Sequence, residues 1–107
     1  MRLCQYKVWK KDILHPGVYE IGFVRNGVFN PKYIGKASFR IYDRIKKHYN
    51  EVGSLIVASY YDERIRDNLY FHVMITENYD SIERNLLRRF KIGKEGGLYE
   101  WNQKYED

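Results

Sequence analysis

Clustered basic side chains are the first feature of this sequence that suggests chemistry. They gather in two segments, residues 32–47 and 84–94. The first segment holds six basic residues and one acid, and the second holds five basic residues and no acid. Aromatic residues are interleaved with them, and this mixture suits a polyanion, because ammonium and guanidinium groups displace the counterions condensed on phosphates. A solvated helix face would explain the same charges.

A carboxylate on an apolar helix face is the second such feature. Residues 80–91 are predicted to form a helix in which Glu83 shares a face with the apolar residues. A carboxylate in that place is costly unless it is paired, capped or bound to a metal. One alternative is a capping box, in which Asp80 caps the helix and Glu83 folds back onto the cap. The apolar residues of this face are Ile82, Leu86, Leu87 and Phe90.

A basic stripe is predicted on an earlier helix. Ser38 is a fair N-cap for a helix over residues 39–49. At helical spacing the basic residues lie apart from the apolar face, and Arg44 and His48 are neighbours because they are one turn apart. The stripe consists of Arg40, Arg44, Lys47 and His48, and the apolar face of Ile41, Tyr42, Ile45 and Tyr49.

The strands that must position these groups begin with a β-hairpin. Residues 17–25 and 28–36 are predicted strands, separated by an Asn-Gly pair that suits a two-residue turn. In a regular ladder Tyr33 would lie on the opposite side of the sheet from Tyr19. Because Asn30-Pro31 interrupts the second strand, we expect a one-residue bulge there, which brings both tyrosines to one face.

The remaining segments complete the outline. Residues 1–16 are predicted to be an irregular lead-in with one short edge strand over 6–9, and residues 53–68 suit a strand or, as we favour, a helix. Residues 69–76 are predicted to be a strand, whose nearly continuous apolar character favours a central position. His72 within it is interpreted as a structural histidine. A tail is expected to pack back on the body through Leu98, Tyr99, Trp101 and Asn102.

Length and composition indicate one compact unit. The chain has 107 residues, 44% hydrophobic residues and a formal net charge of +5, which suits a single domain over 1–107 with a lead-in, 1–16, and a core, 17–102. Cys4 is the only cysteine, so an intrachain disulfide and a Cys-based zinc site are excluded. No apolar run reaches the length of a signal peptide or a membrane span. We therefore expect an intracellular, cytoplasmic protein with no membrane partner.

The order of the candidate residues resembles the GIY-YIG endonuclease family. The two halves of the family motif read Gly17-Val18-Tyr19, with valine in place of isoleucine, and Tyr33-Ile34-Gly35. Either tripeptide alone carries little information, and the specificity comes from later residues that stand in the family's order. The resemblance covers roughly residues 15–102. The later residues are an Arg-x-x-x-His pair, an acid that opens a further helix and an asparagine near the end, namely Arg44, His48, Glu83 and Asn102.

The resemblance implies an α/β (α+β) fold, with a small three-stranded antiparallel sheet flanked by helices, and metal-dependent hydrolysis of phosphodiesters. Glu83 would hold one Mg²⁺ or Mn²⁺ ion. Arg44 would donate to the non-bridging phosphate oxygens. Tyr19 or Tyr33 would act as the base once a nearby positive charge lowers its pKa, and His48 would hydrogen-bond a tyrosine or a phosphate. The positive charge would come from Lys36, Arg44 or the metal.

Four further residues are implied to bind the substrate. Asn102 would position the site or contact the nucleic-acid backbone. Arg40 is also a rival of Arg44 for the arginine role, and we prefer Arg44 because only it has a histidine four residues later. The four residues are Lys36, Arg40, Lys47 and Asn102.

The expected substrate is the DNA phosphate backbone, cleaved with low intrinsic sequence specificity. A non-catalytic nucleic-acid-binding module on the same fold and an RNA-directed nuclease are the alternatives. A homodimer or an accessory specificity protein would supply further selectivity, and the expected setting is a bacterial or phage-infected cell. A carboxylate without a metal would repel phosphate, so Glu83 favours the enzyme over the binding module.

Overall fold

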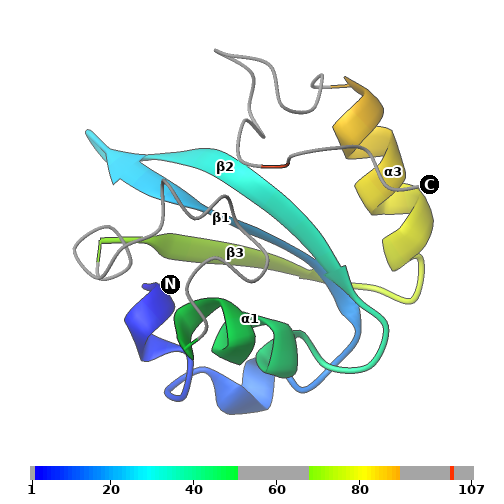
Figure 1. Ribbon diagram of the computed structural model, residues 1–107, viewed down its shortest axis with the longest axis horizontal. Coiled ribbons are helices and arrows are strands. Elements are labelled where there is room, and N and C mark those ends of the chain that lie inside the picture. Colours follow the sequence, from blue (N-terminus) through cyan, green and yellow to red (C-terminus); the bar gives the residue numbers. More distant parts are fainter. Residues whose placement is uncertain (1, 51–67, 90–101, 103–107) are drawn as a thin grey trace.

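The protein has an α+β fold built on a three-stranded antiparallel sheet, which confirms the predicted fold class. A computed structural model describes residues 2–50, 68–89 and 102. The strands are β1 (Gly17–Arg25), β2 (Val28–Ala37) and β3 (Tyr70–Ile75), in the spatial order β2-β1-β3. Figure 1 shows the sheet with the α-helices of the described residues, α1 (Ile41–Asn50) and α3 (Tyr79–Arg89).

The hairpin of β1 and β2 forms as predicted. Asn26 and Gly27 make the turn with φ angles of 52° and 75°, the left-handed region that Asn and Gly tolerate best. The ladder starts at Arg25 opposite Val28 and shifts its register between Gly22, opposite Pro31, and Ile21, opposite Tyr33. The bulge is therefore confirmed and lies just after Pro31, because proline lacks the N–H that a regular ladder would need there.

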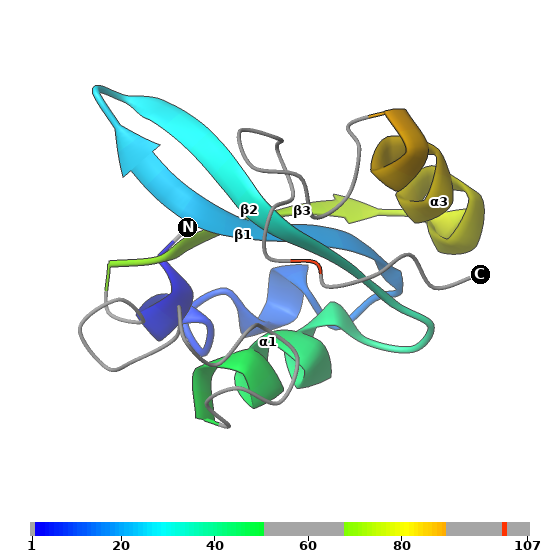
Figure 2. The ribbon, with the colours of Figure 1, turned by 45° about the horizontal axis from the view of Figure 1, so that its top comes forward.

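Helices α1 and α3 cover opposite faces of the sheet (Figure 2). Alternation along β1 sends Tyr19 and Ile21 to the α1 side, where they are fully buried against Ile41 and Ile45. Val18 points to the other side and packs with Ile34 and Leu87, and Ile82 and Leu86 of α3 add to this smaller cluster. The predicted apolar faces of both helices are thus confirmed for the residues that the structure describes.

Helix α1 begins two residues later than predicted, at Ile41, so Ser38 is not its cap. The first helical N–H groups instead donate to carbonyls of the lead-in. Ile41 N donates to His15 O at 2.9 Å, and Tyr42 N donates to Ile13 O at 2.8 Å. A distant segment therefore satisfies the donors that a local cap would serve, and sequence spacing gave no signal of it.

The lead-in forms two short 3-10 helices, η1 (Leu3–Gln5) and η2 (Lys10–Asp12), so the predicted edge strand over 6–9 is wrong. Leu3 is fully buried and its N–H donates to Leu69 O at 2.8 Å, which fastens the lead-in beside β3. Consecutive turn hydrogen bonds along residues 3–13 use the backbone groups that a strand would have paired.

Strand β3 pairs with β1 alone among the described strands, so its predicted central position is also wrong; β1 is the central strand. The apolar run misled the prediction because Met74 and Ile75 are about half exposed, at 52% and 47%. His72 is exposed and stacks on Phe29, with 3.8 Å between the ring centroids, which agrees with a structural role.

The helix favoured over residues 53–68 falls almost entirely outside the described residues, as do Phe90, Leu98, Tyr99 and Trp101. Within the described ranges, no helix has the length and apolar character needed to cross a membrane.

Candidate functional site

Tyr19 and Gly35 define the centre of the candidate site. They are partners in the β1–β2 ladder, and Tyr19 is fully buried. A Cβ atom built on Gly35 would overlap the ring and the hydroxyl group of Tyr19. Glycine is therefore required at position 35, because the tyrosine ring fills the space above it.

His48 fixes the hydroxyl group of Tyr19. Its Nε2 atom lies 2.9 Å from Tyr19 Oη, and its side chain, on the inward side of α1, is 1% exposed. Burial, helped by the positive charge of Arg44, lowers the pKa of His48 to about 3. The imidazole is therefore neutral at neutral pH, and a neutral ring with its proton on Nδ1 can accept the hydroxyl proton at Nε2.

Tyr33 joins this pair because the bulge turns it to the same face. Its ring centroid lies 6.3 Å from that of Tyr19 and 5.0 Å from that of His48. The expected meeting of the two tyrosines on one face of the sheet is confirmed. Without the extra residue after Pro31, the ring would lie on the α3 side, away from His48.

A nearby positive charge was expected to lower the pKa of Tyr19 or Tyr33, but in this structure the pKa values of both are raised. Burial raises the pKa of Tyr19 far above its ordinary value, Tyr33 raises it further, and Arg44 only partly offsets the two. Burial likewise raises the pKa of Tyr33 against the opposing charge of Arg44. Both phenols are protonated at neutral pH in the substrate-free protein, because desolvation outweighs the nearby guanidinium group.

Arg44 carries an unsatisfied donor. Its Nε atom is buried and has no hydrogen-bond partner within the described part of the chain. Leaving a buried donor unpaired costs about 1–3 kcal/mol, and more for a charged group. An anionic ligand that accepted this hydrogen bond would remove the cost, so Arg44 is suited to hold a phosphate.

Arg40 is engaged elsewhere, which supports the preference for Arg44. Its guanidinium group donates twice to the carboxylate of Asp43, at 2.9 and 3.1 Å. It also lies over the ring of Phe39, 5.1 Å from the centroid. A guanidinium group with both partners in place has less to gain from a phosphate than one with an unpaired donor.

Glu83 lies on α3 at the other side of β2, and its side chain is 11% exposed. Burial raises its pKa, while the charge of Lys36, 3.9 Å away, is the largest influence that lowers it. The charge of Glu83 also acts on the pKa values of both Tyr19 and Tyr33, so it belongs to the same electrostatic site although it comes from the opposite layer.

The capping-box alternative for Glu83 is wrong. Helix α3 starts at Tyr79, so Asp80 lies inside its first turn, and the residue before the helix is Asn78. The carboxylate of Asp80 accepts a hydrogen bond from Lys36 at 2.5 Å. Sequence reasoning treated Asp80 only as a cap; two carboxylates three residues apart at the start of a helix were the signal for a shared cationic partner.

The donor set at Glu83 fits a magnesium ion held largely by water. Among the described residues there is no group of three or more His, Cys, Asp or Glu side chains that could hold a metal. Mg²⁺ does not need one, because it commonly takes one or two carboxylates and completes its shell with water and phosphate oxygens. The largely buried carboxylate of Glu83, which Lys36 approaches to 3.9 Å, is suited to that role.

Asn102 acts on the backbone of the site. Its side-chain Oδ1 accepts from Ile34 N at 3.0 Å, and its Nδ2 donates to Ile34 O at 2.9 Å. Both bonds are buried and fall on the residue next to Tyr33. Of the two roles expected for Asn102, this geometry supports positioning of the site.

The structure therefore gathers most of the expected site residues. Lys47 is exposed on α1, and Arg40 is paired with Asp43, so these two lie outside the cluster. Asn102 and Lys36 adjoin the cluster, one through Ile34 and the other through Glu83. The cluster itself consists of Tyr19, Tyr33, Arg44 and His48, and Glu83 acts on it through its charge.

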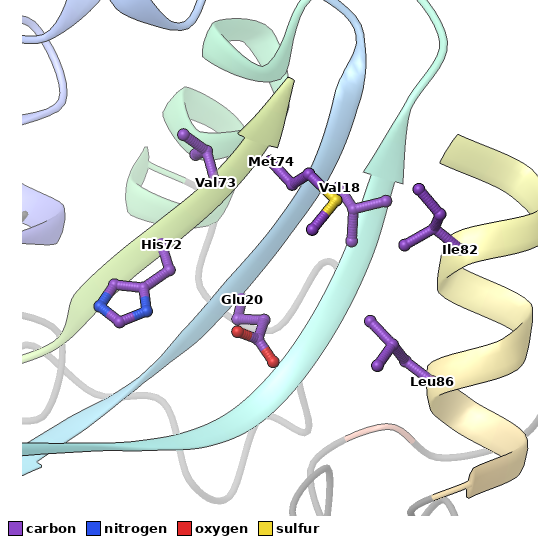
Figure 3. A pocket seen from close by; sticks show the side chains of 7 residues that line it. All are labelled: Val18, Glu20, His72, Val73, Met74, Ile82 and Leu86. Carbon is purple, nitrogen blue, oxygen red and sulfur yellow. The ribbon is translucent and has the colours of Figure 1, made fainter. Parts of the chain in front are cut away.

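A shallow groove lies on the α3 face of the sheet and is distinct from this cluster. Figure 3 shows Val18 of β1 facing Ile82 and Leu86 of α3, with Glu20 and His72 farther from α3. The groove is mostly apolar and contains none of the clustered residues, so we do not assign the chemistry to it.

Comparison of the chain with protein families, with curated proteins and with solved structures finds no match.

Proposed function

We propose that this protein is a metal-dependent endonuclease of the GIY-YIG type that hydrolyses DNA phosphodiester bonds. The observation that carries the proposal is the unpaired, buried Nε donor of Arg44 beside the Tyr19–His48 hydrogen bond. A phosphate oxygen is the ligand that a guanidinium group satisfies best, and a phenol next to a neutral imidazole can pass on a proton. These two features together suit hydrolysis at phosphorus rather than binding alone.

The residues of the site have complementary roles in this proposal. Arg44 holds the non-bridging oxygens and compensates the charge that grows on them. The attacking water gives a proton to Tyr19 Oη as the Tyr19 hydroxyl proton passes to His48 Nε2. The new P–O bond forms as the bond to the leaving oxygen breaks. Because the leaving oxygen departs on the side opposite the attacking water, it takes its proton from solvent water, and the imidazolium gives its proton back to solvent. The ring of Tyr33 packs beside the rings of Tyr19 and His48 and helps to hold them in place.

Phosphate binding makes this proton transfer easier than it is in the free protein. The charge of Arg44 lowers the pKa of His48, and a bound phosphate would offset that charge. A divalent metal at Glu83, when bound, would stabilise the negative charge on the phosphate and the leaving oxygen. Lys36 and Asp80 would keep the surroundings of Glu83 close to electrical balance.

Plasmid cleavage tests the proposal. Supercoiled plasmid is incubated with the protein and Mg²⁺ or Mn²⁺, with EDTA as a control. We expect nicking that depends on the metal and is lost in Glu83→Gln. Glu77→Gln is the matched control, because Glu77 is an exposed carboxylate just before α3. Absence of nicking with either metal would favour the binding module instead, and nicking that survives Glu83→Gln would contradict the metal assignment. RNA offered in parallel would show whether the activity is confined to DNA.

A further inference from the structure

Phe39 is an aromatic side chain left in solvent beside the candidate site. It lies between β2 and α1 and is 71% exposed (the loop is visible in Figure 1). The folded protein gains little from a large apolar ring in that position, because most of its surface remains in contact with water.

The ring is nevertheless held in a defined place. The guanidinium group of Arg40 lies 5.1 Å from its centroid, and Asp43 holds that guanidinium group through two hydrogen bonds. Asp43 is the third residue of α1, so the chain of contacts runs from a helix to the exposed ring. An aromatic ring with a guanidinium group over it is thus presented to solvent from a rigid base.

The loop is tied to the site at both of its ends. Lys36, which contacts Asp80 and approaches Glu83, comes three residues before Phe39, and Arg44 comes five residues after it. Three residues of extended chain span at most about 10 Å, so Phe39 lies within about that distance of Lys36, which borders Glu83, and is in reach of nucleotides that flank a phosphate bound at the site. A ligand placed at the site by its phosphate would bring its neighbouring bases to this ring.

We propose that Phe39, backed by Arg40, is a stacking platform for an unpaired base next to the phosphate that is cut. The inference rests on the proposed nuclease function and adds a substrate class to it: DNA that is single-stranded or locally unpaired at the cleavage site. A base within an intact duplex is stacked on both sides and has no free face to offer, whereas an unpaired base can stack on the exposed ring.

The test measures binding by fluorescence anisotropy, with the full chain in EDTA so that no cleavage occurs. Three labelled DNA molecules are compared at one fixed salt concentration: a single strand, the fully paired duplex of the same sequence, and that duplex with a central bulge of unpaired bases. The variants are Phe39→Ala and Phe39→Trp. Val28→Ala is the matched control, since Val28 is 61% exposed at the hairpin turn, at the far end of β2.

Phe39→Ala is expected to weaken binding of the single strand and the bulged duplex by about 5- to 100-fold, with less than about a twofold effect on the paired duplex. Phe39→Trp should keep the wild-type affinity. Val28→Ala should leave the affinity for each of the three DNA molecules unchanged. An equal effect of Phe39→Ala on all three molecules, or no effect, would overturn the platform and leave the nuclease proposal standing. Failure of the wild-type protein to bind any of the three would also overturn the platform, whereas the nuclease proposal is decided separately by the metal-dependent nicking of plasmid.

Discussion

Gly35 lies directly opposite Tyr19 in the sheet, and the tyrosine ring occupies the space that a side chain at position 35 would need. The ring of Tyr19, in the first tripeptide, can therefore take this position only because residue 35, in the second tripeptide, is a glycine. The two tripeptides are far apart in the sequence, but the pairing of β1 with β2 brings them into direct contact.

Gly35→Ala is expected to displace the ring of Tyr19 and break its hydrogen bond to His48. The added methyl group overlaps a fully buried side chain, and overpacking of this kind typically costs about 1–3 kcal/mol in the free energy of unfolding. Urea denaturation and plasmid nicking should both show a loss. Gly27→Asn is the control, because nothing surrounds position 27 and asparagine tolerates its positive φ. An unchanged Gly35→Ala protein would show that the ring position is not fixed by this contact.

His48 should make stability depend on pH in the mildly acidic range. Its pKa is about 3 in the folded protein and about 6.5 when unfolded, so the unfolded chain binds the proton more readily between these values. Stability is therefore full above about pH 6.5 and falls by up to about 1.4 kcal/mol for each pH unit below it. Urea midpoints measured from pH 7 to pH 5 should drop less steeply in His48→Gln than in the wild type. His15→Gln, at an exposed position, should keep the wild-type slope; equal slopes in all three proteins would contradict the prediction.

Asn102→Ala should destabilise the edge of the sheet at β2. It removes both hydrogen bonds to Ile34 and leaves two backbone groups unpaired, at a cost of about 1–3 kcal/mol each when they remain buried. Asn102→Asp retains the acceptor for Ile34 N but turns the donor that faces Ile34 O into a second acceptor, so it should be damaged at least as much. Asn30→Ala, which loses one exposed bond to Val28, serves as the control and should change the unfolding free energy by less than about 1 kcal/mol. The three thermal unfolding curves would refute the positioning role if Asn102→Ala resembled the control.

Lys36→Met should shift the acidic limb of the activity profile. Metal binding needs ionised Glu83, whose pKa is already raised by burial and is lowered mainly by Lys36. Removing that ammonium group raises the pKa of Glu83 further, so nicking should fail at a higher pH than in the wild type. Initial nicking rates between pH 5 and pH 8 would show the shift, and Lys47→Met, on an exposed part of α1, should leave the limb in place. A shift to lower pH would contradict this account of the carboxylate.

Local patterns were sufficient to predict the hairpin, its bulge and the amphipathic faces of both helices. The Asn-Gly turn and the proline act within a few residues, so the meeting of Tyr19 and Tyr33 could be derived from the chain alone. The start of α1 could not, because its first N–H groups are satisfied by His15 and Ile13 from the distant lead-in. The edge position of β3 could not be predicted either, since an apolar run does not reveal how many strands will flank it.

The candidate site, like the fold, could be predicted from the sequence only where local spacing determines it. Arg44 and His48 are one helical turn apart, so their proximity follows from the helix. The partner of Lys36 and the effect of burial on the tyrosines depend on how α3 packs against β2, which only the three-dimensional arrangement shows. The expected lowering of a tyrosine pKa was wrong for the substrate-free protein because desolvation is a property of the whole packed site.

Whether Arg44 receives the phosphate is decided by comparing the cleavage rates of Arg44→Ala and Arg40→Ala on one DNA substrate with Mg²⁺. We expect a loss of about 100-fold or more for Arg44→Ala, as for removal of a group that compensates transition-state charge. Arg40→Ala, whose guanidinium group is already paired with Asp43, should keep the rate within about tenfold, a loss no larger than one stacking contact would give. Equal losses in the two variants, or a greater loss in Arg40→Ala, would contradict the assignment.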